Sequence, residues 1–252
     1  MNNENTLTNL YPRTTDKIWR RLCDLPHQVS QACDALFPGD FARLYELVLP
    51  FTLLSNARLR GLYRAVNHAE AHSIEGDVVE CGTARGGSAA LMGLTLKKLK
   101  TNRNLWVFDT FEGLPAPTMA DPDYEAASHY TGECRGELKE VEQLFQQFEI
   151  RKETRFVKGL FQDTLPVCDV EKIAVLHLDG DWYESVKTCL DHLYDRVSVG
   201  GIIQIDDYGH WAGARKAVDE FMRERRIKSP LRYLDYTGRQ LIKPPINESV
   251  GC

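Results

Sequence analysis

The spacing of apolar residues along the chain changes near residue 73. Before that point, residues 16–37 and 41–72 repeat apolar side chains every three or four positions, which is typical of amphipathic helices. The stretch FPGD separates the two segments, and Pro50 is expected to kink or stop the second helix. Residues 1–72 are therefore predicted to form a helical cap, a lid or a dimerisation segment.

From residue 76 onwards, short runs rich in β-branched residues alternate with helix-like segments. Five runs are predicted as strands, at residues 76–82, 104–111, 154–161, 172–180 and 200–207. The helix-like segments cover residues 88–100, 137–148, 184–197 and 213–226. This alternation predicts a parallel, doubly wound α/β sheet with helices on both faces.

The end of the chain breaks the alternation. LRYLDY, a TG turn and RQLIK, together residues 231–243, predict an antiparallel hairpin. A mostly parallel sheet with an antiparallel C-terminal hairpin fits the Rossmann-like class I S-adenosylmethionine-dependent methyltransferase fold better than a plain dinucleotide-binding fold. Residues 73–252 are accordingly predicted to form one domain of this class.

The end of the first predicted strand has the features of a cofactor cradle. VVECGTARGGSAAL combines a strand, a turn containing glycines and a helix start, whose amides attract an anion. Asp109 ends the second strand, where an acid can accept hydrogen bonds from a ribose diol. The spacing E-x-G-x-A-x-G from Glu80 favours S-adenosylmethionine over NAD. Alternatively, the glycines only permit close packing and Asp109 caps a loop.

The stretch GLFQDTLP follows the third predicted strand and supplies Asp163 at a further strand end. There its carboxylate could reach the adenine amino group or the ammonium of the cofactor. The alternative is that Asp163 caps the local turn.

Two pairs of acids follow the fourth and fifth predicted strands. LHLDGDWYES contains Asp179 and Asp181, and GGIIQIDDYGHW contains Asp206 and Asp207. If these strands are neighbours, they run about 4.8 Å apart, and acids from both strands can converge on one ion. Oxygen ligands alone point to Mg²⁺, Mn²⁺ or Ca²⁺, and not to zinc. For either pair alone, a set of helix or turn caps is the competing interpretation.

Composition narrows the class of protein. The net charge of -5 argues against a nucleic-acid partner, since such surfaces are normally basic. No apolar stretch approaches the length that crosses a bilayer, and the polar N-terminus does not resemble a signal peptide. Seven scattered cysteines contain no C-x-x-C pair, so most are expected to be buried thiols in a reducing compartment. We therefore expect a cytoplasmic protein without a membrane partner.

These motifs resemble the macrocin O-methyltransferase (TylF-like) family over roughly residues 45–225. The upstream stretch TLLSNARLRGLYRAV also resembles the segment before that family's first strand. The resemblance implies Mg²⁺ and S-adenosylmethionine as cofactors, and methylation of hydroxyls on sugars attached to macrolides, aminocoumarins and similar natural products. It places the metal ligands at Asp179, Asp206 and Asp207, the general base at Asp181, and the cofactor contacts at Glu80, Gly82, Ser88, Asp109 and Asp163.

Several expectations follow for the rest of the chain. The polar loop at residues 115–136 is expected to set specificity for the small-molecule acceptor, with His129 and Tyr130 solvated in it. His177 is expected to be a core histidine, and Trp211 either lines the substrate site or packs. The N-terminal helices make a homodimer plausible. Competing functions are methylation of a catechol or another vicinal diol, cofactor binding without catalysis, and a nicotinamide-dependent oxidoreductase.

Overall fold

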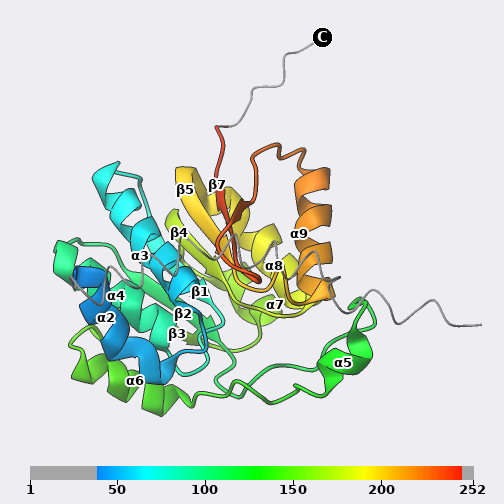
Figure 1. Cartoon of the computed structure of the whole chain (residues 1–252), viewed down its shortest axis with the longest axis horizontal. Helices are drawn as coiled ribbons and strands as arrows, with labels where there is room; N and C mark the ends of the chain where they lie inside the picture. The colour runs from blue at the N-terminus through cyan, green and yellow to red at the C-terminus, as the bar shows by residue number, and fades with distance from the viewer. Residues whose placement is uncertain (1–38, 246–252) are drawn as a thin grey trace, which may run out of the picture.

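A single sheet in the order β3-β2-β1-β4-β5-β7-β6 organises the molecule, which a computed structural model describes for residues 39–245 (Figure 1). The first five strands run parallel, whereas β7 pairs antiparallel with both β5 and β6. The strands are β1 (Asp77–Cys81), β2 (Leu105–Asp109), β3 (Thr154–Lys158), β4 (Ile173–Leu178), β5 (Val197–Ile205), β6 (Arg232–Tyr233) and β7 (Arg239–Ile242). The predicted fold class, including the terminal hairpin, is confirmed.

Helices cover both faces of this sheet (Figure 1). They are α2 (Asp40–Val48), α3 (Asn56–Ala71), α4 (Gly87–Leu99), α5 (Tyr124–Ser128), α6 (Leu138–Gln147), α7 (Phe161–Thr164), α8 (Tyr183–Leu193) and α9 (Ala212–Glu224). The core on one face joins the sheet to α2, α3, α4 and α6, and the core on the other face joins it to α8 and α9. Within residues 39–245, no helix has the length and apolar character needed to span a membrane.

The segment before the first strand is helical where it is described. Helix α2 ends at Val48, and Pro50 lies in a short 3-10 turn, so the predicted break near this proline is confirmed. Side chains of α2 and α3 belong to the same core as strands β1 and β2. The helix predicted at residues 16–37 lies outside the described residues, and the division of the chain into residues 1–72 and 73–252 stays a prediction.

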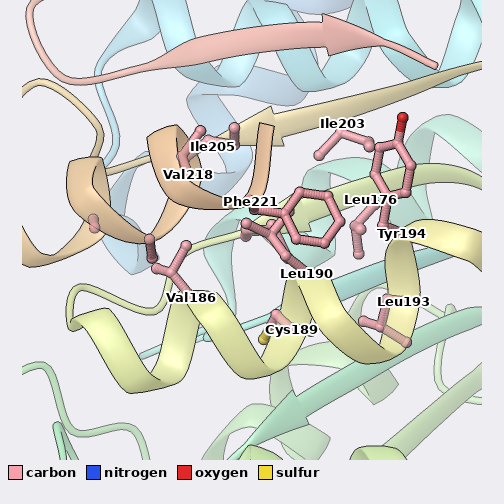
Figure 2. Close-up of a cluster of buried hydrophobic side chains, with 14 of the residues drawn as sticks. Leu176, Val186, Cys189, Leu190, Leu193, Tyr194, Ile203, Ile205, Val218 and Phe221 are labelled. Carbon is pink, nitrogen blue, oxygen red and sulfur yellow. The ribbon is translucent and has the colours of Figure 1, made fainter. Parts of the chain in front are cut away.

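The packing of α8 and α9 against the sheet shows why the sequence forms these helices (Figure 2). Val186, Cys189, Leu190 and Leu193 recur at helical spacing, and all four side chains are buried. Full burial of one such leucine or valine contributes about 1.5–3 kcal/mol to folding. The apolar face of α8 thereby fixes the position of its first turn, which directly follows one of the two acid pairs.

The hydrogen-bond ladder of the parallel strands continues past their carboxyl ends. The backbone N–H of Asp179 donates to Cys81 (2.8 Å), and that of Asp206 donates to Leu178 (2.8 Å). Gly82 follows β1 with φ +87°, and a Cβ atom on it would overlap the carbonyl oxygen of Asp179. Strand order reverses between β1 and β4, which is where open α/β sheets bind their ligands.

Replacing Gly82 with Ala is expected to lower the free energy of unfolding by roughly 2–5 kcal/mol, because strain from the left-handed backbone adds to overlap with Asp179. Gly132 is a matched control, since its φ is +83° but nothing lies within 4 Å of the position that a methyl group would take. Gly132→Ala should therefore cost only about 1–2 kcal/mol. Urea unfolding measures both values, and equal losses would show that the close approach to Asp179 is unimportant.

Candidate functional site

A cleft of about 360 Å³ lies at the carboxyl ends of β1, β4 and β5. Its walls come from the glycine turn after β1, the residues just before α3, the loop after β2, and the ends of β4 and β5. Of the residues predicted for the site, those that line it are Gly82, Ser88, Asp109, Asp179, Asp181, Asp206 and Asp207. The fold therefore brings most of the predicted residues together.

Two predicted cofactor residues lie elsewhere. Glu80 is fully buried inside the sheet, beneath the cleft. Asp163 is exposed on α7, and its neighbours Phe161 and Gln162 line the cleft instead. The sequence located the strand end correctly, but it could not tell which residue of the following helical turn faces inwards.

The turn after β1 has an unusual backbone conformation. Ala84 and Gly86 both have positive φ, and the N–H of Gly86 donates to the carbonyl of Thr83 (2.8 Å). The hydroxyl oxygen of Thr83 is buried and has no hydrogen-bond partner among the described residues, although Thr83 lines the cleft. A polar atom of this kind fits a ligand with a charged amino-acid end, such as S-adenosylmethionine.

Asp109 fastens this turn to the end of β2. Its carboxylate accepts hydrogen bonds from the backbone N–H groups of Thr83 (2.7 Å), Ala84 (3.2 Å) and Phe111 (2.6 Å). Burial raises the pKa of Asp109, and these hydrogen bonds partly offset the rise. Asp109 thus has the loop-holding role considered as an alternative above, while its place in the cleft wall remains compatible with ribose binding.

The four acids form two overlapping groups. Ligand atoms of Asp179, Asp181 and Asp207 lie within 4.8 Å of one another, and so do those of His177, Asp179 and Asp206. Burial, and after it the charges of Asp206 and Asp207, holds the pKa of Asp179 well above its usual value. Burial likewise raises the pKa of Asp207, and burial with the charge of Asp206 raises that of Asp181 to about 7.

His177 lies beneath the cleft, between Glu80 on β1 and Asp206 at the end of β5. Its Nδ1 lies 2.8 Å from Oε1 of Glu80, and its Nε2 lies 3.7 Å from Oδ1 of Asp206. Burial lowers the pKa of His177, but Asp206 and Glu80 outweigh this effect and raise it to about 9. The predicted core histidine is indeed fully buried, and it also bridges two acids of the site.

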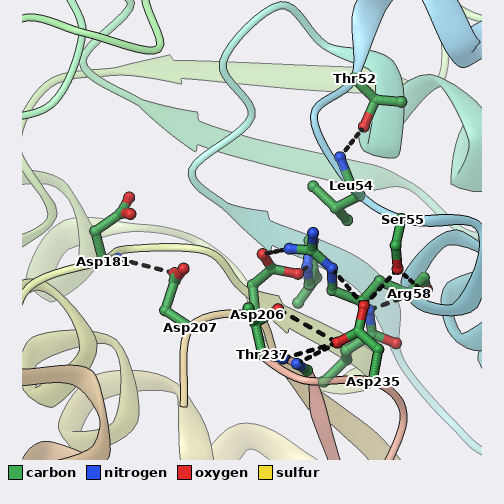
Figure 3. A network of polar contacts seen from close by, with 12 residues as sticks. Thr52, Leu54, Ser55, Arg58, Asp181, Asp206, Asp207, Asp235 and Thr237 are labelled. Atoms are coloured by element: carbon green, nitrogen blue, oxygen red, sulfur yellow. Dashed lines mark hydrogen bonds and ion pairs between the residues drawn. The ribbon is translucent and has the colours of Figure 1, made fainter. Parts of the chain in front are cut away.

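Arg58 on α3 lines the cleft, and the sequence interpretation missed it (Figure 3). Its guanidinium pairs with Asp206 and, through Nε, with Oδ2 of Asp235 (3.1 Å). Asp235, in the turn between β6 and β7, also accepts a hydrogen bond from Ser55, which caps α3. Arg58 lies within the stretch TLLSNARL, but no local pattern indicates that this stretch meets the end of β5.

Asp181 is fixed by contacts on both its backbone and its side chain. It has φ +55°, its N–H donates to Oδ2 of Asp207 (3.2 Å), and its Oδ1 accepts from the indole of Trp211 (3.0 Å). The ring of Tyr130 packs edge-on against that of Trp211 at 5.3 Å, and both line the cleft. Tyr130 is 47% exposed, as expected for a residue of a solvated loop, and its ring also packs against Trp211.

The loop expected to set specificity is attached to the helices that follow the acids. Asp121 accepts a hydrogen bond from the N–H of Tyr183 (2.7 Å) at the start of α8. Asp123 accepts one from the N–H of Ala212 (2.8 Å) at the start of α9. Both contacts place carboxylates at helix N-termini, where they are favourable. The loop is thus held over the acid end of the cleft.

The residues present fit a divalent cation. Oδ1 of Asp206 is buried and accepts no hydrogen bond from the described residues. Arg58 is the one lysine or arginine among the described residues that line the cleft, and it cannot balance four neighbouring acids. Oxygen donors in this number suit Mg²⁺ or a similar hard ion. Asp206 pairs with Arg58. Asp206 and Asp207 belong to different ones of the two groups described above, and only Asp179 is common to both.

Residues 47–242 match the model of the macrocin-O-methyltransferase (TylF) family. The chain belongs to this family. As a member of the macrocin O-methyltransferase family, it is an S-adenosylmethionine-dependent O-methyltransferase. The resemblance drawn from the sequence motifs is confirmed.

Two curated relatives illustrate the similarity within the macrocin O-methyltransferase family. Demethyldecarbamoylnovobiocin O-methyltransferase of Streptomyces niveus is 33% identical over 194 residues, which cover 74% of this chain and 73% of that protein. Mycinamicin III 3''-O-methyltransferase of Micromonospora griseorubida is 34% identical over 194 residues, which cover 74% and 76% of the two chains.

Solved structures agree with this assignment. The O-methyltransferase NovP superposes with a TM-score of 0.72 at 31% identity, covering 77% of this chain and 83% of that chain. The calicheamicin methyltransferase CalS11 superposes with a TM-score of 0.60 at 20% identity, covering 96% and 98%. The second comparison supports the fold alone.

Replacing Arg58 with Met is expected to lower the free energy of unfolding by about 3–5 kcal/mol, because Asp206 and Asp235 lose their shared cation. Arg103 is a matched control: its side chain is 15% exposed against 14% for Arg58, but its partner Glu70 is 39% exposed. Arg103→Met should cost about 1–2 kcal/mol. Urea unfolding measures the loss of stability in both variants. Similar losses would mean that the ion pairs of Arg58 contribute no more than that of Arg103.

Proposed function

We propose that this O-methyltransferase transfers a methyl group to a hydroxyl of a sugar carried by a natural product, and that it uses Mg²⁺ to do so. The single observation that carries this proposal is the convergence of four carboxylates beside the glycine turn in one cleft. The acceptors in the names of its relatives support the substrate class, since they include an O-methyltransferase for a rhamnosyl-tetracenomycin from Streptomyces olivaceus, 37% identical over 193 residues.

In this proposal Asp179, Asp206 and Asp207 hold Mg²⁺. When bound, the ion supplies a positive field that lowers the pKa of an acceptor hydroxyl. For both Asp206 and Asp207 to face one ion, Asp206 keeps Oδ2 on Arg58 and offers Oδ1, which has no other hydrogen bond among the described residues. Arg58 and His177 then hold this carboxylate from two sides.

Asp181 is assigned as the general base. It lies just before α8, two residues past Asp179, and lines the cleft. Its Oδ1 is engaged by Trp211, while its Oδ2 accepts no hydrogen bond from the described residues and is available for the hydroxyl proton. Proton removal by a positioned base typically contributes 10²–10⁴-fold to a rate.

When bound, S-adenosylmethionine would supply the methyl group, and the glycine turn after β1 would hold it. Gly82, Ser88 and Thr83 line the cleft at this turn, and the Thr83 hydroxyl has no hydrogen-bond partner within residues 39–245. Asp109 keeps the turn in place and would face the ribose. Glu80 is assigned an indirect part, through the buried pair that it forms with His177. Asp163 stays a prediction, and its neighbours Phe161 and Gln162 are the residues of α7 in the cleft wall.

A panel of acceptors tests the substrate class directly. It contains demethyldecarbamoylnovobiocin and mycinamicin III as glycosides, a nucleotide-linked rhamnose, and catechol as an aromatic diol. Methylation is followed by mass spectrometry with Mg²⁺ and S-adenosylmethionine. Turnover of a glycoside supports the proposal, whereas turnover of catechol alone would replace the sugar by an aromatic acceptor.

The cellular location and assembly state are further proposals. We expect a cytoplasmic homodimer that binds neither nucleic acid nor membranes, and gel filtration with light scattering measures its mass against the 28.7 kDa of one chain.

Replacing Asp181 with Asn is expected to lower kcat by roughly 10²–10⁴-fold, because the base is lost while its shape is kept. Calorimetry should find wild-type affinity for S-adenosylhomocysteine and for Mg²⁺. Asp191→Asn on the exposed side of α8 is the control, since Asp191 pairs with Lys187 away from the cleft, and it should behave as wild type. A fully active Asp181→Asn variant would remove this residue from the reaction.

Removing the metal is expected to abolish turnover, which should return when Mg²⁺ is added after treatment with EDTA. The Asp207→Asn variant should bind Mg²⁺ roughly 10- to 100-fold more weakly, because one proposed ligand is lost. It should keep its affinity for S-adenosylhomocysteine, because Asp207 follows β5 and is not part of the glycine turn after β1. Calorimetric titration measures both affinities. Turnover that is indifferent to EDTA would exclude Mg²⁺ from the function.

A further inference from the structure

Asp181, the proposed general base, is held in place by the turn that follows β5. The turn runs from Asp207 to Trp211, and the N–H of Trp211 donates to the carbonyl of Asp207 (3.0 Å). It contacts Asp181 twice, through Oδ2 of Asp207 and through the indole N–H of Trp211. Both the backbone and the carboxylate of Asp181 are therefore held from one short segment.

The indole ring of Trp211 is itself firmly placed. It is 8% exposed, and the ring of Trp182 packs edge-on against it with centroids 4.9 Å apart. On another side it meets Tyr130, from the loop expected to contact the acceptor. Because the ring is fixed by packing, its N–H points at Oδ1 of Asp181 without further ordering, and a hydrogen bond between prearranged groups loses little entropy.

We propose that Trp211 is a positioning residue for the reaction, whose indole N–H holds Oδ1 of Asp181 and so leaves Oδ2 to take the proton of the acceptor hydroxyl. The proposal rests on the proposed function, because it requires Asp181 to be the base. Nothing in the sequence distinguishes this role from simple packing, since both need an aromatic residue there. The 3.0 Å contact between Nε1 and Oδ1 decides between them.

The informative substitution is Trp211→Phe, which keeps an aromatic ring and removes the N–H. The matched control is Trp106→Phe, because the indole of Trp106 also donates to an aspartate, Asp77, at 2.9 Å, but far from the cleft. Both variants lose one hydrogen bond from an indole to a carboxylate. Only the first should affect the reaction.

The hydrogen bond can be observed without any acceptor. The chain has four tryptophans, so the ¹⁵N-labelled protein gives four indole N–H resonances. The resonance lost in Trp211→Phe should shift in Asp181→Asn, and the one lost in Trp106→Phe should shift only in Asp77→Asn. If Asp181→Asn leaves the Trp211 resonance in place, the contact does not exist in solution and the proposal is overturned.

Kinetics then test the role, using the best acceptor of the panel. Trp211→Phe should lower kcat roughly 10- to 100-fold, as expected for a hydrogen bond to a charged group. The KM of the acceptor and the affinities for S-adenosylhomocysteine and Mg²⁺ should stay at wild-type values, as should all parameters of Trp106→Phe. In an Asp181→Asn background, the second substitution at Trp211 should have no further effect.

The outcomes separate two failures. If Asp181→Asn is inactive and Trp211→Phe turns over within twofold of wild type, the role of Trp211 fails and the base assignment survives. If Trp211→Phe lowers kcat equally in the wild-type and Asp181→Asn backgrounds, Trp211 acts independently of Asp181 and the proposal is again overturned. If Asp181→Asn is fully active, the base assignment itself fails.

Discussion

Four carboxylates share one end of the sheet, and their mutual repulsion is the constraint on which the site depends. Burial and neighbouring charges raise the pKa of Asp179, Asp181 and Asp207 together. The protein offsets part of this cost with Arg58, with His177 and with N–H donors directed at the acids. The remaining negative charge is what makes the cleft suited to a cation.

The same constraint explains why distant segments meet there. Arg58 comes from α3 and pairs with Asp206 at the end of β5. Asp235 comes from the turn of the C-terminal hairpin and pairs with the same guanidinium (Figure 3). The hairpin pairs with β5 and so brings this turn alongside the acids. The C-terminal hairpin lies at the edge of the sheet, but its turn therefore contributes to the contacts around the acids.

Close packing at the carboxyl ends of the strands positions both the glycine turn and the acids. Gly82 allows β1 and β4 to stay together beyond their last paired residues, which draws the cofactor turn towards the acids. Asp109 fastens the other side of that turn. The loop that carries Tyr130 is attached at Asp121 and Asp123 to the helices that begin beside the acids. The glycine turn, the acids and this loop are thus parts of one connected framework.

The sequence by itself determined the strands, the main helices, the hairpin and most of the cleft. These depend on short-range patterns: apolar periodicity, glycine at turns, and acids at strand ends, where parallel strands deliver them to one edge. It could not tell which residue of the turn with Asp163 faces the cleft, because one helical turn decides this, and it missed Arg58 and the packing of Tyr130. Those contacts join segments that lie far apart in the sequence, and only the tertiary structure, through side-chain packing and the pairing of buried charges, decided them.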